Sequence, residues 1–157
     1  MYNLKFHPDR ERPVRHSEWS AKHILDYLDT CYHGPIKKTL DLGMGRGELV
    51  QQLKKRGIDA CGVDLRDLGQ KDLIQADARN LPFEKESFDL VTEVYFLADM
   101  NELQRMPGNE LWKVVQEAKR ILKPGGIFLS TPARSYREEG PFEKIIYENE
   151  FLKVFQK

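Results

Sequence analysis

The stretch TLDLGMGRGELV, residues 39–50, decides the fold. An apolar run that includes Asp41 leads into Gly43, Gly45 and Gly47, and a helix-like pattern follows at once. Because glycine has no Cβ atom, it lets the backbone turn sharply and lets a ligand approach closely. We therefore predict a buried strand, a turn that binds a ligand, and a helix. The alternative is a tight turn with a purely structural role.

The rest of the chain alternates strand and helix patterns around this stretch. We predict strands at 38–42, 59–65, 72–76, 88–95 and 127–131, and helices at 17–30, 48–56 and 109–123. Such alternation favours an α/β fold in which helices cover both faces of a mainly parallel sheet. We predict one domain over residues 1–157, made of an N-terminal arm (1–16), an N-terminal helix (17–30), a core (36–132) and a short C-terminal segment (133–157).

Composition argues against several classes of protein. The 25 basic and 25 acidic side chains among 157 residues cancel, so no overall field favours nucleic acid or an anionic membrane. No apolar run approaches the ~18 residues of a membrane span, and the N-terminus lacks the apolar segment of a signal peptide. We therefore expect a cytoplasmic protein. Cys31 and Cys61 have no CxxC spacing, and we predict no metal site.

The glycine pattern also bears on the kind of ligand. The dinucleotide fingerprint G-x-G-x-x-G would need glycine at position 48, where this chain has Glu48. The pattern here is D-x-G-x-G-x-G, with Asp41 on the strand before the turn. An acidic residue at that place favours a ligand with a positive charge near the glycines over a pyrophosphate. A nicotinamide-dependent oxidoreductase is therefore disfavoured.

Five motifs, in order along the chain, resemble those of the class I S-adenosylmethionine-dependent methyltransferases. They are LDLGMGRGE, Asp64 at the end of the second strand, QADARNLPF, SFDLVTEVY and RILKPGGIFLSTP, all within residues 36–132. The resemblance implies a Rossmann-like three-layer sandwich with the strand order 3-2-1-4-5. It also implies methyl transfer from S-adenosylmethionine, with S-adenosylhomocysteine as the product.

The resemblance implies nine cofactor-binding residues, which are Asp41, Gly43, Gly45, Gly47, Asp64, Leu65, Asp77, Ala78 and Glu93. Asp64 would accept hydrogen bonds from the ribose diol, and bonds to a carboxylate are stronger than neutral ones. Leu65 would pack on the adenine ring, Asp77 would accept from the adenine amino group, and the N–H of Ala78 would donate to a ring nitrogen. Structural alternatives are a solvated carboxylate at Asp64, core packing at Leu65 and a turn cap at Asp77.

Two further carboxylates would meet the amino group of the cofactor. Asp41 would orient the glycine loop and face that amino group directly or through water, because a buried carboxylate without a partner is unfavourable. The resemblance puts Glu93, at the end of the fourth strand, near the same group. The alternative for Glu93 is a surface glutamate.

The methyl acceptor has no recognisable signature in this chain. The fourth strand continues as EVYF, which is neither the Asn/Asp-Pro-Pro-Tyr/Phe tetrad of base amino methylation nor a Pro-Cys nucleophile. Tyr95, Arg134 and Tyr136 come from loops on the expected substrate side, although for each residue the alternative, a solvated loop side chain, is favoured over a role in acceptor binding. The sequence does not identify the catalytic residues, and a general base is needed only if the acceptor must lose a proton. Proximity and orientation can supply most of the acceleration, because the methyl group is already activated.

The C-terminal segment departs from the family pattern. After Thr131 we predict a loop and a helix at 149–156, and we expect the C-terminal antiparallel hairpin to be missing. That would leave the fifth strand as an uncovered edge, which a second copy or a partner protein would cover. The alternative to an active enzyme is therefore a non-catalytic or partner-dependent subunit that binds the cofactor or a partner protein.

Overall fold

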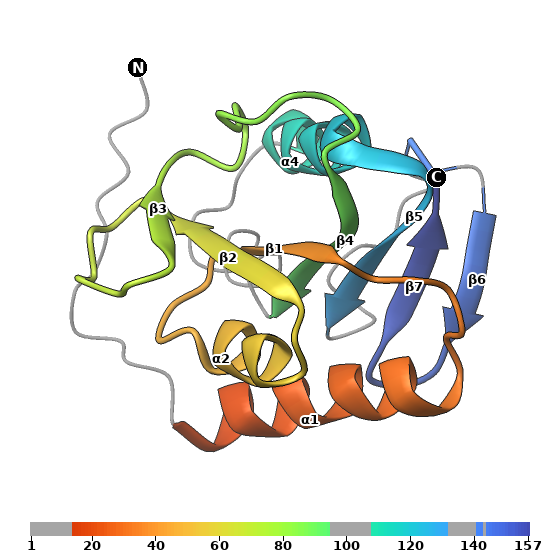
Figure 1. The fold of residues 1–157 in the computed structure, drawn as a ribbon. Coiled ribbons are helices and arrows are strands. Elements are labelled where there is room, and N and C mark those ends of the chain that lie inside the picture. The colour runs from red at the N-terminus through yellow and green to blue at the C-terminus, as the bar shows by residue number, and fades with distance from the viewer. Residues whose placement is uncertain (1–13, 95–107, 132–140, 143) are drawn as a thin grey trace.

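The structure is a computed structural model of the chain, and it describes residues 14–94, 108–131, 141–142 and 144–157. These residues form one seven-stranded sheet with the order β3-β2-β1-β4-β5-β7-β6 (Figure 1). The strands are β1 (Lys38–Leu42), β2 (Asp59–Asp64), β3 (Leu73–Gln75), β4 (Phe88–Val94), β5 (Leu122–Thr131), β6 (Lys144–Glu148) and β7 (Lys153–Gln156). The helices within the described residues are α1 (Val14–Thr30), α2 (Glu48–Lys55) and α4 (Gly108–Ile121).

The parallel part of the sheet has the predicted order. β1 lies at its centre and pairs in parallel with β2 and β4, while β3 and β5 extend the sheet on either side. The order 3-2-1-4-5 is therefore confirmed. Since β1 is flanked by strands that come later in the chain on both sides, the chain reverses direction across the sheet at β1. Ligands of open parallel sheets bind beside such a reversal, at the carboxyl ends of the strands.

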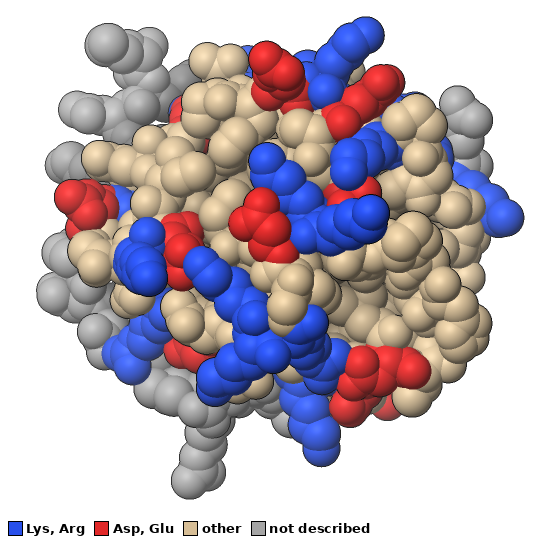
Figure 2. Space-filling view, in the orientation of Figure 1, with Lys and Arg blue, Asp and Glu red and all other residues tan. Residues whose placement is uncertain are grey.

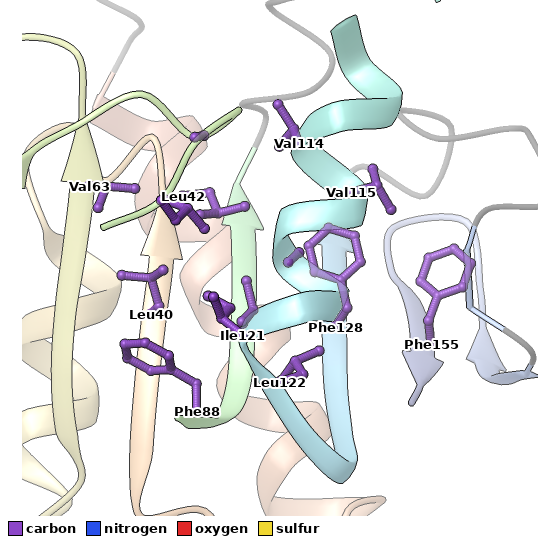
Figure 3. Close-up of a cluster of buried hydrophobic side chains, with 14 of the residues drawn as sticks. Leu40, Leu42, Val63, Phe88, Val114, Val115, Ile121, Leu122, Phe128 and Phe155 are labelled. Atoms are coloured by element: carbon purple, nitrogen blue, oxygen red, sulfur yellow. The ribbon is translucent and has the colours of Figure 1, made fainter. Parts of the chain in front are cut away.

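Helices cover both faces of the sheet, as the three-layer sandwich requires. α1 and α2 pack on one face, where Ile24, Val50 and Leu129 are buried in a common cluster. α4 packs on the other face, where its apolar side chains meet those of β1, β4 and β5 (Figure 3). In this second cluster the Phe128 ring stacks on Phe142, with ring centroids 5.4 Å apart. The α/β prediction is confirmed on both faces.

The expected absence of a C-terminal hairpin is wrong. β6 and β7 form an antiparallel pair, and the predicted helix at 149–156 is a turn followed by β7. The turn is built on Asn149, whose side-chain oxygen accepts the backbone N–H groups of Phe151 and Leu152 at 2.8 and 2.7 Å. A side chain that bonds the backbone in this way favours a turn over a helix.

The fifth strand is not an edge either. β7 pairs antiparallel with β5, and Val154 lies opposite Leu129 while Phe155 lies opposite Phe128. Val154 and Phe155 are buried on opposite faces of the sheet, one in each core cluster. A partner that covers a bare β5 is therefore not needed, and that expectation is wrong.

Charged side chains of both signs share the molecular surface. Figure 2 shows lysine and arginine side chains gathering over α2, with acidic side chains beside them. Two of these basic residues are paired: Lys54 contacts Asp72 at 2.5 Å and Arg56 contacts Asp29 at 2.6 Å. None of the helices in the described segments combines the length and the apolar character needed to cross a bilayer.

Candidate functional site

The glycine loop follows β1 at the carboxyl edge of the sheet. Gly43, Gly45 and Gly47 have φ angles of 68°, 55° and 77°. These lie in the left-handed region, which residues with a Cβ atom rarely adopt. The N–H groups of Gly43 and Met44 both donate to the carbonyl of Val63, at 2.8 and 3.0 Å, so the loop is attached to β2.

The three loop glycines differ in what surrounds them. A Cβ atom on Gly47 would lie 2.7 Å from Cε of Met44, whose side chain is buried. A Cβ atom on Gly45 would meet nothing nearer than the carbonyl oxygen of Gly43, at 3.8 Å, within the described part of the chain. Gly47 therefore also serves internal packing, whereas the loop at Gly45 is open. The open side leaves room for a ligand.

A small pocket lies beside this loop. Its lining residues are Gly43, Val63, Asp64, Leu65, Ala76, Asp77 and Ala78. Five of the nine predicted cofactor residues are among them. They meet because β2 and β3 are parallel and in register: Asp64 pairs with Gln75, and the N–H of Ala76 donates to the carbonyl of Asp64 at 3.0 Å. The pocket thus joins the loop after β1 with the ends of β2 and β3.

Each of the two pocket carboxylates is held by an arginine two positions later. Asp64 accepts from the backbone N–H of Arg66 at 3.0 Å and from its guanidinium at 3.1 and 3.2 Å. Asp77 accepts from the backbone N–H of Arg79 at 2.9 Å and from its guanidinium at 2.6 and 3.0 Å. The side chain of Asp64 is 8% exposed and that of Asp77 is 35% exposed. Sequence reasoning did not find either arginine, although DLR and DAR are visible in the sequence.

Asp41 is buried inside the sheet. Its carboxylate accepts a hydrogen bond from the Thr92 hydroxyl at 2.7 Å. Burial raises the pKa of Asp41 to about 7; the Thr92 hydrogen bond opposes that rise and the charge of Glu48 adds to it. Near neutral pH this carboxyl group is therefore poised between its two protonation states. A cationic neighbour would favour the ionised form.

Glu93 lies on the other face of the sheet. It follows Thr92 along β4 and pairs with Leu42, and successive residues of a strand point to opposite faces. The Ser130 hydroxyl donates a hydrogen bond to the carboxylate of Glu93, and both residues are buried. Asp41 and Glu93 thus approach the same strand ends from opposite faces. The alternative of a surface glutamate is therefore excluded, since Glu93 is fully buried.

The predicted acceptor residues cannot be compared with this site. Tyr95, Arg134 and Tyr136 lie outside the described residues. Sequence reasoning also missed Thr92 and Ser130, the two hydroxyl groups on the buried carboxylates. Only the register of β1, β4 and β5 brings those pairs together, and no local pattern in the sequence encodes it.

Comparison with known proteins agrees with this geometry. The model of a family described as "Methyltransferase domain" matches residues 40–130, more than half of the chain. The chain belongs to the class I methyltransferase family. The cofactor of this family is S-adenosylmethionine.

Two curated relatives show how far the likeness extends. The chain is 32% identical over 136 residues to phthiotriol/phenolphthiotriol dimycocerosates methyltransferase 1 of Mycobacterium ulcerans. This match covers 84% of the chain and 45% of the relative. The chain is also 32% identical over 151 residues to the ubiquinone biosynthesis O-methyltransferase of Paraburkholderia phymatum, which covers 86% of the chain and 58% of the relative. The chain thus spans about half the length of these relatives.

A solved structure supports the fold of the chain. The crystal structure of the PH0226 protein from Pyrococcus horikoshii matches with a TM-score of 0.66 and 20% sequence identity. The match covers 94% of this chain and 92% of that one. At this identity the likeness speaks for the fold alone.

Proposed function

We propose that this methyltransferase binds S-adenosylmethionine at the carboxyl ends of β1 and β2 and transfers its methyl group to an acceptor. The observation that carries the proposal is the pocket that joins Gly43 with Asp64, Asp77 and Ala78. The two carboxylates match the hydrogen-bond donors of an adenosine, which are a ribose diol and an adenine amino group. The glycine loop lets the ligand approach the backbone closely. The open side of the loop at Gly45 agrees with close approach of the ligand.

The pocket residues would each hold one part of the cofactor. Asp64 would accept from the ribose hydroxyls, and Leu65 would cover the adenine ring. Asp77 would accept from the adenine amino group, while the N–H of Ala78 would donate to the ring. A hydrogen bond to a charged partner contributes about 1.5–3 kcal/mol. Two carboxylates at these positions would therefore contribute to selectivity for an adenosine ligand.

Asp41 and Glu93 would hold the amino end of the cofactor. An ammonium group is the partner that a buried carboxylate needs in order to ionise. The hydrogen bond from the Thr92 hydroxyl already orients the Asp41 carboxylate, and Asp41 lies two residues before the first glycine of the loop. We infer that the ammonium group of the cofactor favours the ionised form of Asp41 on binding.

The chain itself has few chemical tasks in the transfer. When bound, the cofactor supplies a methyl group on a sulfonium, already activated for displacement. The protein has to orient that methyl group toward the acceptor and exclude water. Tyr95, Arg134 and Tyr136 stay our predictions for the acceptor side. The expected cytoplasmic location also stays a prediction.

The alternative of a non-catalytic or partner-dependent subunit loses its main support. That alternative was motivated by a missing C-terminal hairpin, and β6 and β7 provide that hairpin. Its other motive, the lack of an acceptor signature, is compatible with an active enzyme whose acceptor is unidentified.

Calorimetric titration with S-adenosylhomocysteine tests the proposal. The unaltered chain should bind this product, and Asp64→Ala should bind it about 10- to 100-fold more weakly. Asp67→Ala is the matched control, because Asp67 is exposed and bonds only the nearby N–H of Gly69 among the contacts described for it. Equal weakening in both variants, or no binding to the unaltered chain, would contradict the proposed site.

Turnover separates the two candidate functions. The chain is incubated with S-adenosylmethionine and a cell extract, and the S-adenosylhomocysteine formed above that of the extract alone is measured. Formation of the product in the unaltered chain and its loss in Asp64→Ala support the enzyme. Binding of the product together with no turnover supports the non-catalytic alternative.

A further inference from the structure

Segment 76–87 connects β3 to β4 and carries the predicted adenine residues. It contains no helix, and side chains of α4 hold it in two places. In the first place Arg79 bridges the segment to α4: its guanidinium contacts Asp77 at 2.6 Å and Glu110 at 2.8 Å. In the second place Arg120 donates to the carbonyls of Phe83 and Leu81 at 2.8 and 3.0 Å. Only the first attachment includes a residue of the pocket.

Arg79 is fixed more firmly than an ordinary surface arginine. Its side chain is 25% exposed and that of Glu110 is 18% exposed. Lys113 contacts Glu110 at 2.7 Å on the side chain's other oxygen, so Glu110 is itself held. A planar guanidinium that spans two carboxylates loses its rotational freedom. The orientation of Asp77 is therefore set by α4, through Glu110 and Arg79.

The Asp77 carboxylate has room for one more hydrogen-bond donor, which is what an adenine amino group requires. A carboxylate has about four lone-pair positions for hydrogen bonds. Three N–H groups of Arg79 reach Asp77: the backbone N–H donates to Oδ1, Nη2 donates to Oδ2, and Nε is shared between both oxygens. Because three hydrogens meet about four lone-pair positions, the equivalent of one position is left. An adenine amino group needs a single acceptor at this carboxylate. Arg79 can therefore stay in place while Asp77 accepts from the base.

The ionised form of Asp77 determines what it can recognise. Hydrogen bonds from Arg79 are the main reason that the pKa of Asp77 lies below its ordinary value. An ionised carboxylate only accepts hydrogen bonds, so it favours a donor such as an amino group. A protonated carboxyl group would donate as well as accept, and would select less strictly.

We propose that Arg79 is a positioning residue for base selection: it holds Asp77 as an oriented acceptor, anchored to α4 through Glu110, so that the site selects purines that carry a 6-amino group. The inference rests on the proposed function, since it takes the pocket beside Asp77 as the adenine site. It adds to that function the residues that set the specificity, which lie outside the pocket lining.

Two ligands and four chains test the inference by calorimetry. The ligands are S-adenosylhomocysteine and its 6-deamino analogue, in which hydrogen replaces the amino group of the purine. The unaltered chain should prefer S-adenosylhomocysteine by about 10- to 100-fold, the value of one hydrogen bond to a charged group. In Arg79→Ala that preference should fall by at least about tenfold, through weaker binding of S-adenosylhomocysteine, while the analogue binds as before.

Two further variants separate orientation from general stability. Arg120→Ala loosens the other attachment of the same segment and should change the affinity of both ligands equally, which leaves their ratio unchanged. Arg79→Lys keeps the charge without the planar fork and should retain part of the ratio. If Arg79→Ala does not fold, as judged by its circular dichroism, Arg79→Lys and Glu110→Gln carry the test, and each should lower the ratio.

The outcomes distinguish this inference from the function on which it rests. A ratio in the Arg79 variants equal to that of the unaltered chain would overturn the inference, as would a ratio near one in the unaltered chain that still binds S-adenosylhomocysteine. In both cases the proposed cofactor site stands. Failure of the unaltered chain to bind either ligand would overturn the proposed function, and the inference with it.

Discussion

The Thr92 hydroxyl lies 2.7 Å from the Asp41 carboxylate, between two adjacent strands whose residues are paired in register. Both side chains are buried, and this burial raises the pKa of Asp41 to about 7. The central strand of the sheet thus carries a group that titrates near neutral pH. Two predictions follow from this pair, one for stability and one for binding.

The first prediction concerns the pH dependence of folding. The folded chain keeps the Asp41 proton up to about pH 7, whereas the unfolded chain loses it near the ordinary value of 3.8. This contribution to stability is therefore complete below that ordinary value and is lost as the pH rises to about 7. Asp41→Asn cannot ionise, so its free energy of unfolding should not fall with this titration. Urea unfolding should show that the difference in free energy of unfolding, variant minus unaltered chain, increases by about 1–3 kcal/mol from pH 5 to pH 8. Parallel pH profiles would contradict the prediction.

The second prediction concerns cofactor binding. If the ammonium group of the ligand meets ionised Asp41, binding releases the Asp41 proton below pH 7. The affinity for S-adenosylhomocysteine should then rise about tenfold from pH 6 to pH 8. Calorimetry in buffers with different ionisation enthalpies measures the proton release directly. Asp41→Asn serves as the control, and a pH slope that persists in it would mean that another group titrates.

The third prediction tests the open side of the glycine loop. Gly45 and Gly57 both have positive φ angles, 55° and 78°, and neither has close neighbours among the described residues at the Cβ position. Alanine should destabilise the chain by a similar amount at either position, about 1–2 kcal/mol. Only Gly45→Ala should weaken binding of S-adenosylhomocysteine, by about tenfold or more. Gly57 follows α2 on the far side from the pocket, so Gly57→Ala is its matched control; equal affinities would show that the loop does not contact the ligand.

The fourth prediction concerns Gly62, in the middle of β2. A Cβ atom there would lie 2.3 Å from Cβ of Met44, an atom close to the backbone that cannot move away easily. Gly62→Ala should therefore destabilise the chain by about 1–3 kcal/mol through overpacking. Thermal melting measures the loss. A melting temperature equal to that of the unaltered chain would show that the glycine loop shifts readily, against the rigid support described for the pocket.

The fifth prediction concerns Arg66, whose loss should strengthen binding of S-adenosylhomocysteine, whereas loss of Arg79 should weaken it. Arg66 donates three hydrogen bonds to Asp64, which leaves one of about four acceptor positions, whereas a ribose diol needs two. Arg66 must therefore give up one of these hydrogen bonds when the ligand binds. Since its side chain is 47% exposed, the pair contributes no more than about 1 kcal/mol. Arg66→Ala should bind S-adenosylhomocysteine up to about fivefold more tightly. Weaker binding in titration would mean that Arg66 contacts the ligand itself.

Local patterns in the sequence predicted the parts of the site that depend on neighbouring residues. Gly43 could be predicted from the glycine pattern after a buried strand, and Asp64 and Asp77 from short motifs that resemble those of the methyltransferase family. The Asp41–Thr92 contact could not, because it joins residues 51 positions apart through the register of β1 and β4. The link from Arg79 to Glu110 depends likewise on how α4 is placed.

The missed hairpin has a different physical cause. β7 is only four residues long and is buried on both faces, so KVFQ lacks the alternation of a half-buried strand. Together with the preceding apolar residues it resembled an amphipathic helix. The informative residue was Asn149, whose side chain closes the turn before β7.

The place of β7 in the sheet also determines the order in which the strands can pair while the chain is being synthesised. β7 follows β6 along the chain but lies between β6 and β5, and in the described sheet β6 pairs with β7 alone. As the ribosome extends the chain, β6 emerges before the strand that can attach it. A nascent chain whose residues up to 150 have emerged from the ribosome would therefore expose the pairing groups of β5, which other chains can capture. Within the described sheet, β5 is covered on this side only once residues 153–156 have inserted between β5 and β6.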